Sequence, residues 1–439
     1  MEIKNNYKHL SFILIFLSIF SFFLGFYLDE NSAGGGSYIG DWSFLWPNLK
    51  LFIENDLHTA ITHESLLTNR PPLLYMLHAS LNPFVEDEIA YRRSVFLISL
   101  TVPILFYFCL RQKFKQEDNL LLILVASTVF LSPYFRTSSF WGLEENYGFI
   151  CLLLTYLFLN SFLKNKNENG YKIYFQLFLL TFFSSLCIYF DQKLIIIPII
   201  SFFTVIFSKK IIRLKLFLIF LYIIFSIPYI YLIKLWGGIF PSYLTSSRNL
   251  TNQLYLEHIG YASTIIAFYF VPFLLFRGKN LLIDIKKFFL QKGNYYLILL
   301  FLIYIFYLLI ISIFNDQSSL NIEASTGKGF IHKFSFILFN DNFIFREIFI
   351  YFSFLISWLI ILIFLDKNLK NSLILLYFFI VSIVTLPLMQ EYFDPLILII
   401  VLTFFNSKIF IDYKNAMILF FYLSIFLVIS NIYYYNLLY

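Results

Sequence analysis

The chain has 439 residues, of which 60% are hydrophobic and 13% are charged, and its mean hydropathy is +0.78. Soluble proteins carry about 25% charged residues, so this composition excludes a water-soluble globular protein. The net charge of +6 does not indicate a nucleic-acid partner, because basic residues normally flank the cytoplasmic ends of membrane spans. Three cysteines, Cys109, Cys151 and Cys187, lie within apolar runs and have no spacing typical of metal ligands or a disulfide framework.

The first apolar run covers residues 10–28 and follows Lys4 and Lys8. It is longer than the core of a signal peptide, which has roughly 7–15 residues, so we interpret it as a retained helix. Cleavage near Asn31-Ser32-Ala33 is the alternative. With the runs that follow, it predicts an all-α, polytopic membrane protein of about 13 transmembrane helices. We expect a single integral membrane domain over 1–439, with runs at 10–28, 92–110, 119–133, 147–163, 173–190, 194–208, 215–234, 260–276, 295–314, 345–365, 371–387, 393–407 and 415–436.

The charges between these runs predict the orientation. With the N-terminus in the cytoplasm, roughly two thirds of the 32 Lys and Arg fall on the inner side, as the positive-inside rule requires. Most acidic residues then fall outside. The long polar segments also emerge outside, so we expect any chemistry at the outer face, in a bacterial inner or plasma membrane. These segments are 29–91, 134–146, 235–259 and 315–344.

The first outer loop, 29–91, contains the stretches GDWSFLWPNLKLF and NRPPLLY. Within it, residues 71–85 are too short to cross a bilayer and begin with prolines. Proline is favoured in the first turn of a helix, so the segment predicts a helix lying at the membrane interface, begun by Pro72.

The outer turns combine acidic and basic side chains. Ionisable residues at a membrane face are costly to bury and are often functional. The alternative for each acid is a solvated charge or a helix cap, which the helix dipole favours and which fits Glu144 and Glu145 well. The basic residues could bind a lipid phosphate or anchor the chain at the interface. The acids are Asp29, Asp41, Glu144, Glu145, Asp191, Glu391 and Asp394, and the bases include Arg70, Arg136, Lys193, Lys333 and Arg346.

The order of these features resembles the GT-C superfamily of multi-span glycosyltransferases. It is most similar to the family of dolichyl-phosphate-glucose-dependent α-1,2-glucosyltransferases. Asp41 in the first loop precedes the Pro-Pro-Leu-Leu-Tyr stretch at 71–75, as an acidic motif precedes a similar stretch in that family. The family's paired Asp-Glu reads Asp41-Trp42 here, and its late Arg-Tyr reads Glu391-Tyr392. The later matching segments are YRRSVFLISL, SPYFRTSSFWGLEENYGF, YFDQKLIIIP, IHKFSFILFNDNFIFREIF and EYFDPLILII.

The resemblance implies an inverting transfer of a sugar from a polyprenyl-phosphate donor to a lipid-linked glycan or other acceptor of the cell envelope. Such a reaction needs a general base and a positive site for the leaving phosphate. Asp41 is the expected general base, and Asp29 is the second candidate for this role. The resemblance assigns the donor phosphate to Arg70, Lys193 and Arg346, and the acceptor or sugar to Glu144, Glu145, His332, Glu391 and Trp42. We expect no metal and no cofactor. Trp42 could instead anchor the loop at the interface.

Two other functions fit a protein with many spans. A transporter or flippase usually shows related halves and midplane charges, whereas this chain shows no visible repeat. A lipid-linked glycan polymerase or ligase would share the lipid substrate but usually has a larger late outer loop than 315–344. An O-acyltransferase would need a catalytic histidine in the membrane, for which His78 and His258 are weak candidates.

Overall fold

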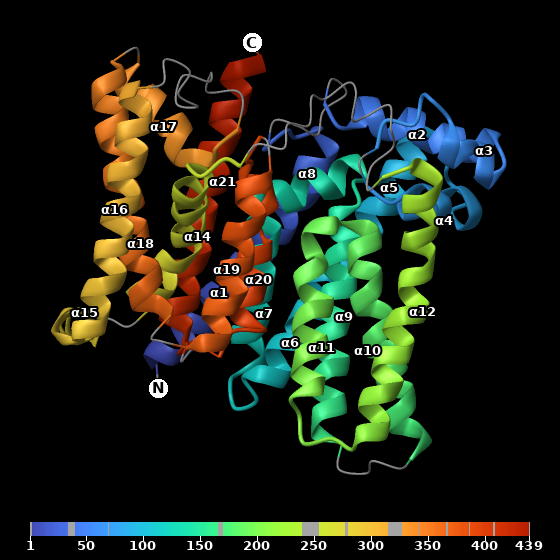
Figure 1. The fold of residues 1–439 in the computed structure, drawn as a ribbon, viewed down its shortest axis with the longest axis horizontal. Coiled ribbons are helices and arrows are strands. Elements are labelled where there is room, and N and C mark those ends of the chain that lie inside the picture. The colour runs from blue at the N-terminus through green and yellow to red at the C-terminus, as the bar shows by residue number, and fades with distance from the viewer. Residues whose placement is uncertain are drawn as a thin grey trace. The chain divides into compact units, whose positions relative to one another are not determined.

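The computed structural model of residues 1–439 is built of helices, and the residues it describes contain no β-strand (Figure 1). The described residues are 2–33, 40–68, 70–165, 170–238, 254–276, 280–314, 327–340, 342–365, 368–385, 387–406 and 409–438. The prediction of an all-α protein is therefore confirmed for this part of the chain.

Nine helices among the described residues are long and apolar enough to cross a membrane, or ten if one bent pair counts as a single span. This finding supports an integral membrane protein. The nine comprise α1 (Glu2–Tyr27), α5 with α6 (Glu88–Ser99 and Thr101–Lys113), α9 (Glu145–Lys164), α10 (Tyr171–Phe190), α12 (Ile212–Trp236), α14 (His258–Leu275), α16 (Lys292–Phe314), α18 (Phe343–Leu365) and α21 (Tyr413–Leu438).

The count of about 13 spans is not confirmed, because four of the predicted runs form shorter or broken helices. The run at 119–133 is one member of the bent pair, which turns by 69°. The break lies at Ser132, whose hydroxyl accepts from Phe135 N–H at 3.1 Å, and at Pro133, which begins the next helix. The shorter elements are α7 (Asn119–Ser127), η1 (Thr128–Leu131), α8 (Pro133–Trp141), η2 (Gln192–Ile195), α11 (Ile196–Ile206), α19 (Leu369–Val384) and α20 (Leu396–Leu402).

Three short helices follow α1 in the first polar segment: α2 (Trp42–Glu54), α3 (Leu57–Thr62) and α4 (Leu73–Leu81). The helix expected at 71–85 is present as α4, which begins directly after Pro72. Helix α2 is amphipathic, with Trp42, Trp46 and Leu49 buried on one face. Apolar burial along this face fixes α2 against α4.

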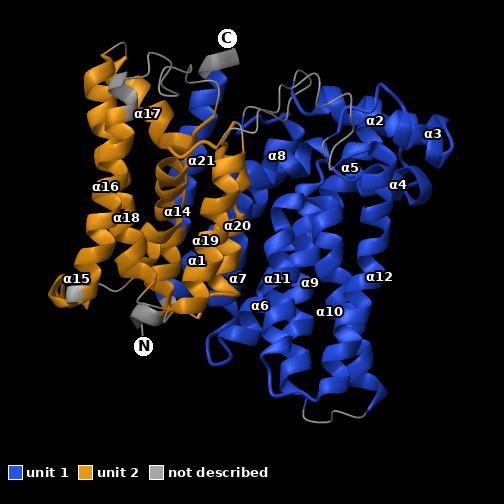
Figure 2. Cartoon of the chain, viewed as in Figure 1, with its two compact units in different colours: residues 1–251, 420–439 blue, residues 252–419 orange. Residues whose placement is uncertain are grey.

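The chain divides into two compact units, residues 1–251 with 420–439 and residues 252–419 (Figure 2). In the first unit, α9 packs against α10 and α6, and α1 packs against α7. In the second unit, α14 packs against α18, α19 and α17 (Gly329–Phe339). The expectation of one integral membrane domain stays a prediction.

Candidate active site

Five charged side chains come together in the first unit, and we call them the charged cluster: Arg70, Glu144, Glu145, Asp191 and Lys193. Arg70 Nη1 lies 2.7 Å from Glu144 Oε1 and 2.8 Å from Glu145 Oε1. Lys193 Nζ lies 3.3 Å from Asp191 Oδ2. The side chains are between 6% and 21% exposed. Three segments far apart in the sequence therefore deliver charges of both signs to one largely buried place.

Local structure presents each member of the cluster. Thr68 accepts the Arg70 N–H at 3.1 Å, and two prolines then lead into α4. Gly142 ends α8 with φ of 71°, a left-handed conformation that favours glycine, and α9 starts at Glu145 with Glu144 as its N-cap. Asp191 follows α10, and its carboxylate accepts the Lys193 N–H at 3.0 Å.

Gly148 lets α9 approach the turn that carries Asp191 and Lys193. A Cβ added at Gly148 would lie 2.6 Å from Leu194 Cδ1 and 3.6 Å from Asp191 Cβ. A larger residue would therefore require the Leu194 side chain to move. The close approach brings Asp191 and Lys193 beside the two glutamates.

Burial and neighbouring charges shift the pKa values of Arg70 and Glu144 in the cluster. Burial alone lowers the pKa of Arg70, but the carboxylates of Glu144 and Glu145 raise this pKa well above its ordinary value. Arg70 is therefore a permanent cation. Burial raises the pKa of Glu144, Arg70 opposes the change, and Glu145 and Asp191 add to it. Glu144 is thus a carboxylate with a raised proton affinity, which suits a general base.

A buried polar network lies between α2, α4 and α9. Asn48 Nδ2 donates to the Tyr75 hydroxyl at 3.3 Å. His78 Nδ1 lies 2.9 Å from Asn82 Nδ2, and His78 Nε2 lies 2.8 Å from the Tyr147 hydroxyl. Burial lowers the pKa of His78 to about 4, so the imidazole is neutral at pH 7. The amide then donates to Nδ1, and Nε2 carries the proton that is donated to Tyr147.

Trp42 lies in a buried aromatic group next to this network. Its ring stacks on Trp46 with centroids 5.4 Å apart and also contacts Trp141 at 6.2 Å. Only 3% of Trp42 is exposed. In this conformation its surface packs within the protein, so contact with a sugar would require rearrangement.

The two aspartates expected as bases occupy different places. Asp41 precedes α2 and is exposed, in contrast to the buried carboxylates of the charged cluster. Asp29, 57% exposed, accepts from Arg92 Nη2 at 2.6 Å. The Arg92 guanidinium also lies 4.0 Å from the Trp141 ring. Asp29 therefore anchors the end of α1 to α5.

A second ion pair, between Glu30 and Arg136, is more deeply buried. Arg136 is 2% exposed and donates to both Glu30 carboxylate oxygens and to Ser21. Asn431 of α21 donates to Glu30 Oε1 at 3.2 Å. The pair and its hydrogen bonds therefore join α1, α8 and α21 within the first unit.

Three other predicted site residues belong to the second unit. The Arg346 guanidinium lies 3.7 Å from the Phe336 ring centroid. His332 is buried, with Nδ1 3.4 Å from the Tyr261 hydroxyl. Glu391 is half-buried in η5 (Gln390–Tyr392) and interacts electrostatically with Lys333. Burial lowers the pKa of Lys333 to about 8, and Glu391 opposes this change.

Sequence reasoning did not single out Lys328 in the second unit. This lysine is 2% exposed, and its Nζ lies 5.3 Å from the Tyr261 ring. Burial lowers the pKa of Lys328 to about 8, and Glu257 opposes the change. Its position in a polar segment gave no sign of burial.

No protein-family model, curated protein or solved structure matches this chain. The function is therefore inferred from the residues of the site itself. Among the described residues, no group of three or more His, Cys, Asp or Glu side chains is arranged to hold a metal ion. The chemistry available in the charged cluster is proton transfer at a buried carboxylate beside fixed positive charges.

Proposed function

We propose that the protein is a membrane glycosyltransferase of the GT-C type. It moves a sugar from a polyprenyl-phosphate donor to a lipid-linked glycan or another acceptor, with inversion. The observation that carries this proposal is the charged cluster, in which Glu144 has a raised pKa and lies beside Arg70 at one end of a spanning helix. A displacement of this kind needs both a base and positive charge.

Glu144 acts as the general base in the proposed reaction. It accepts the proton of the acceptor hydroxyl while the acceptor oxygen bonds to the anomeric carbon. The bond from that carbon to the phosphate oxygen breaks, and the lipid phosphate leaves with the electron pair. Glu144 takes this role in place of Asp41 because it is buried and Asp41 is exposed.

The two cations of the cluster have different roles. Arg70 is a positioning residue, since it is ion-paired with both glutamates. Lys193 is paired with the carboxylate of Asp191 at 3.3 Å, and in the proposed reaction it is the point charge that receives the donor phosphate.

We place the charged cluster at the outer face of the membrane, with the N-terminus in the cytoplasm. The basic residues at the opposite end of α9 support this orientation. The shorter helices described above would complete the thirteen-span arrangement, with neighbouring helices satisfying the exposed backbone groups at their breaks.

The test is sugar transfer by the purified full-length chain, with a panel of polyprenyl-phosphate sugars and a lipid extract as the acceptor source. Glu144→Gln should lower kcat by about 100-fold or more, since general base catalysis typically contributes that much. Donor binding should be retained. Glu64→Gln, at an exposed glutamate of the first outer loop, is the control and should leave kcat unchanged.

Two outcomes would overturn parts of the proposal. Full transfer by Glu144→Gln, with loss in Asp41→Asn, would return the base to Asp41. Absence of transfer with every donor by a folded wild-type protein would reject the transferase, and lipid flux in liposomes would then test a flippase.

A further inference from the structure

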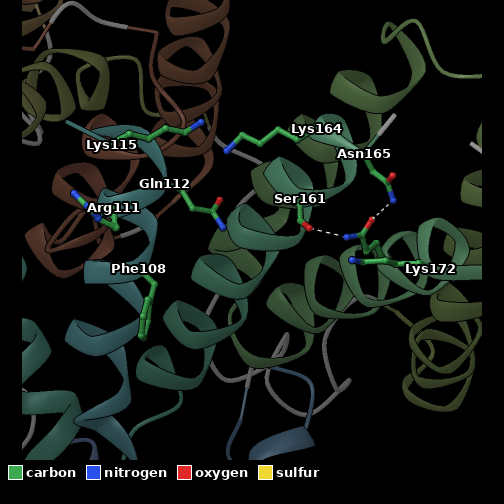
Figure 3. A pocket seen from close by; sticks show the side chains of 9 residues that line it. Phe108, Arg111, Gln112, Lys115, Ser161, Lys164, Asn165 and Lys172 are labelled. Carbon is green, nitrogen blue, oxygen red and sulfur yellow. Dashed lines mark hydrogen bonds between the residues drawn. The ribbon is translucent and has the colours of Figure 1, made fainter. Parts of the chain in front are cut away.

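A basic pocket of about 540 Å³ lies in the first unit, where the C-terminal ends of α6 and α9 meet the start of α10 (Figure 3). Its charged lining residues are Arg111, Lys115, Lys164 and Lys172. Nothing in the proposed transfer reaction uses these residues.

The pocket contains four cations and no carboxylate. Arg111 donates to the backbone carbonyl of Glu117 at 2.8 Å, and among the described residues none of the four forms an ion pair with an acidic side chain. The ammonium groups of Lys115 and Lys164 point toward each other in Figure 3. Like charges brought together in this way repel, and a bound anion would remove the repulsion.

The wall of the pocket is fixed by side-chain hydrogen bonds. Gln176 of α10 donates to Ser161 Oγ at 2.7 Å and accepts from Asn165 Nδ2 at 3.0 Å. These bonds join α9 to α10 beside Lys164 and Lys172. The hollow is therefore formed before any ligand enters, which lowers the entropic cost of binding.

The position of the pocket favours a lipid. Helix α9 has 20 residues, so its ends lie about 30 Å apart, close to the thickness of the bilayer hydrocarbon core. The charged cluster lies at one end of α9 and the basic pocket at the other. Phe108 lines the pocket, and Ile104 lies one turn away on the same face of α6, with 49% and 55% of their surfaces exposed. An acyl chain could lie along this apolar stripe.

We propose that the basic pocket binds the phosphate of an anionic phospholipid at the membrane surface opposite the charged cluster. Lys and Arg side chains supply the positive charge for the phosphate oxygens, and the glutamine and serine side chains supply hydrogen bonds. The site does not depend on the glycosyltransferase proposal, because its evidence lies at the other end of the helix.

The test measures phosphatidylglycerol binding to the delipidated full-length protein by native mass spectrometry. The double variant Lys164→Gln/Lys172→Gln should raise Kd by about 30-fold, since each basic side chain contributes about 1 kcal/mol at such a surface. The matched control Lys209→Gln/Arg213→Gln removes the same charge from two exposed residues outside the pocket and should leave Kd unchanged. Lys164→Arg/Lys172→Arg should retain binding.

Three results would overturn the proposal. An equal rise in Kd for Lys164→Gln/Lys172→Gln and for Lys209→Gln/Arg213→Gln would indicate that the lipid is attracted by the net positive charge and not by the pocket. Equal affinity for phosphatidylcholine would remove the requirement for an anionic lipid. Displacement of the lipid by millimolar inorganic phosphate would assign the pocket to a soluble phosphate instead.

Discussion

One guanidinium nitrogen of Arg70 forms ion pairs with two carboxylates. It lies 2.7 Å from Glu144 Oε1 and 2.8 Å from Glu145 Oε1. All three side chains are largely buried, so water screens their charges poorly. Removing the arginine would leave Glu144 and Glu145 side by side without their shared ion-pair partner. The geometry of the candidate site therefore depends on this one residue.

We predict that Arg70→Met lowers the free energy of unfolding by about 3 kcal/mol, because breaking a buried ion pair leaves uncompensated charge. Thermal denaturation in detergent, calibrated by denaturant unfolding, measures the change. The exposed Arg93 provides the control, and Arg93→Met should have little effect. Adding Glu144→Gln and Glu145→Gln to Arg70→Met should restore most of the lost stability; failure to do so would contradict the assigned ion pairs.

His78 gives the protein a pH-dependent stability. The pKa of His78 is lowered by burial to about 4, whereas an unfolded histidine titrates near 6.5. As the pH falls below about 6.5, the unfolded chain gains a proton that the folded chain does not bind, so stability decreases. From pH 7 to pH 5 this residue should cost about 2 kcal/mol.

The measurement compares unfolding free energies at pH 7 and pH 5 for the wild type and His78→Gln. The variant should lose about 2 kcal/mol of the pH dependence, whereas His58→Gln, at an exposed position, should keep it. An identical pH dependence in His78→Gln and wild type would show that another group is responsible.

At the scale of elements, the start of α9 is where three segments converge. Gly148 allows this convergence because a Cβ there would lie 2.6 Å from Leu194. The α10–η2 turn can therefore place Asp191 and Lys193 beside the glutamates. A single methyl group on α9 would displace the Leu194 side chain, which lies in the same turn as Lys193.

Gly148→Ala should destabilise the protein by about 1–3 kcal/mol, the usual cost of overpacking, and should reduce transfer. Its matched control is Gly293→Ala in α16, where an added Cβ meets nothing within 4 Å and helix propensity favours alanine. In the double variant Gly148→Ala/Leu194→Ala, the shorter side chain at position 194 should relieve the clash. Thermal denaturation compares the wild type, Gly148→Ala, Gly293→Ala and the double variant. Unchanged stability of Gly148→Ala would contradict the close approach.

Much of the helical pattern could be predicted from the sequence, because apolar runs and helix-starting prolines are local signals. The helix begun by Pro72 is an example. Helix length was less predictable. The run at 393–407 forms only the seven-residue α20, since hydropathy does not report where the backbone turns.

The candidate site was only partly predictable. Charges of both signs in the outer turns indicated a site that included Arg70, Lys193, Glu144 and Glu145. Which charges pair depends on packing, however. Nothing local indicates that Asp29 pairs with Arg92, or that Asp41 stays exposed while Glu144 is buried.

At the scale of the whole molecule, the distribution of charge predicts how the chain lies in the membrane. Cysteines introduced at Glu64 and Lys209, both exposed, should report opposite faces. A membrane-impermeant maleimide added to intact cells or right-side-out vesicles should label the Glu64→Cys variant. The same reagent should label the Lys209→Cys variant only after the membrane is permeabilised. The native cysteines are buried and should give little background. Labelling in the reverse pattern would invert the proposed orientation.

The hydrogen bonds from the last helix to the end of α1 affect the order in which the protein can be made. Ser430 donates to the Ser32 carbonyl at 2.6 Å, and Asn431 donates to Glu30 at 3.2 Å. The ribosome therefore synthesises all of residues 252–419 before it reaches the side chains that complete the first unit. Until then, the Glu30–Arg136 pair lacks its amide donor, and a chain released before residue 420 would lack both of these hydrogen bonds of the first unit.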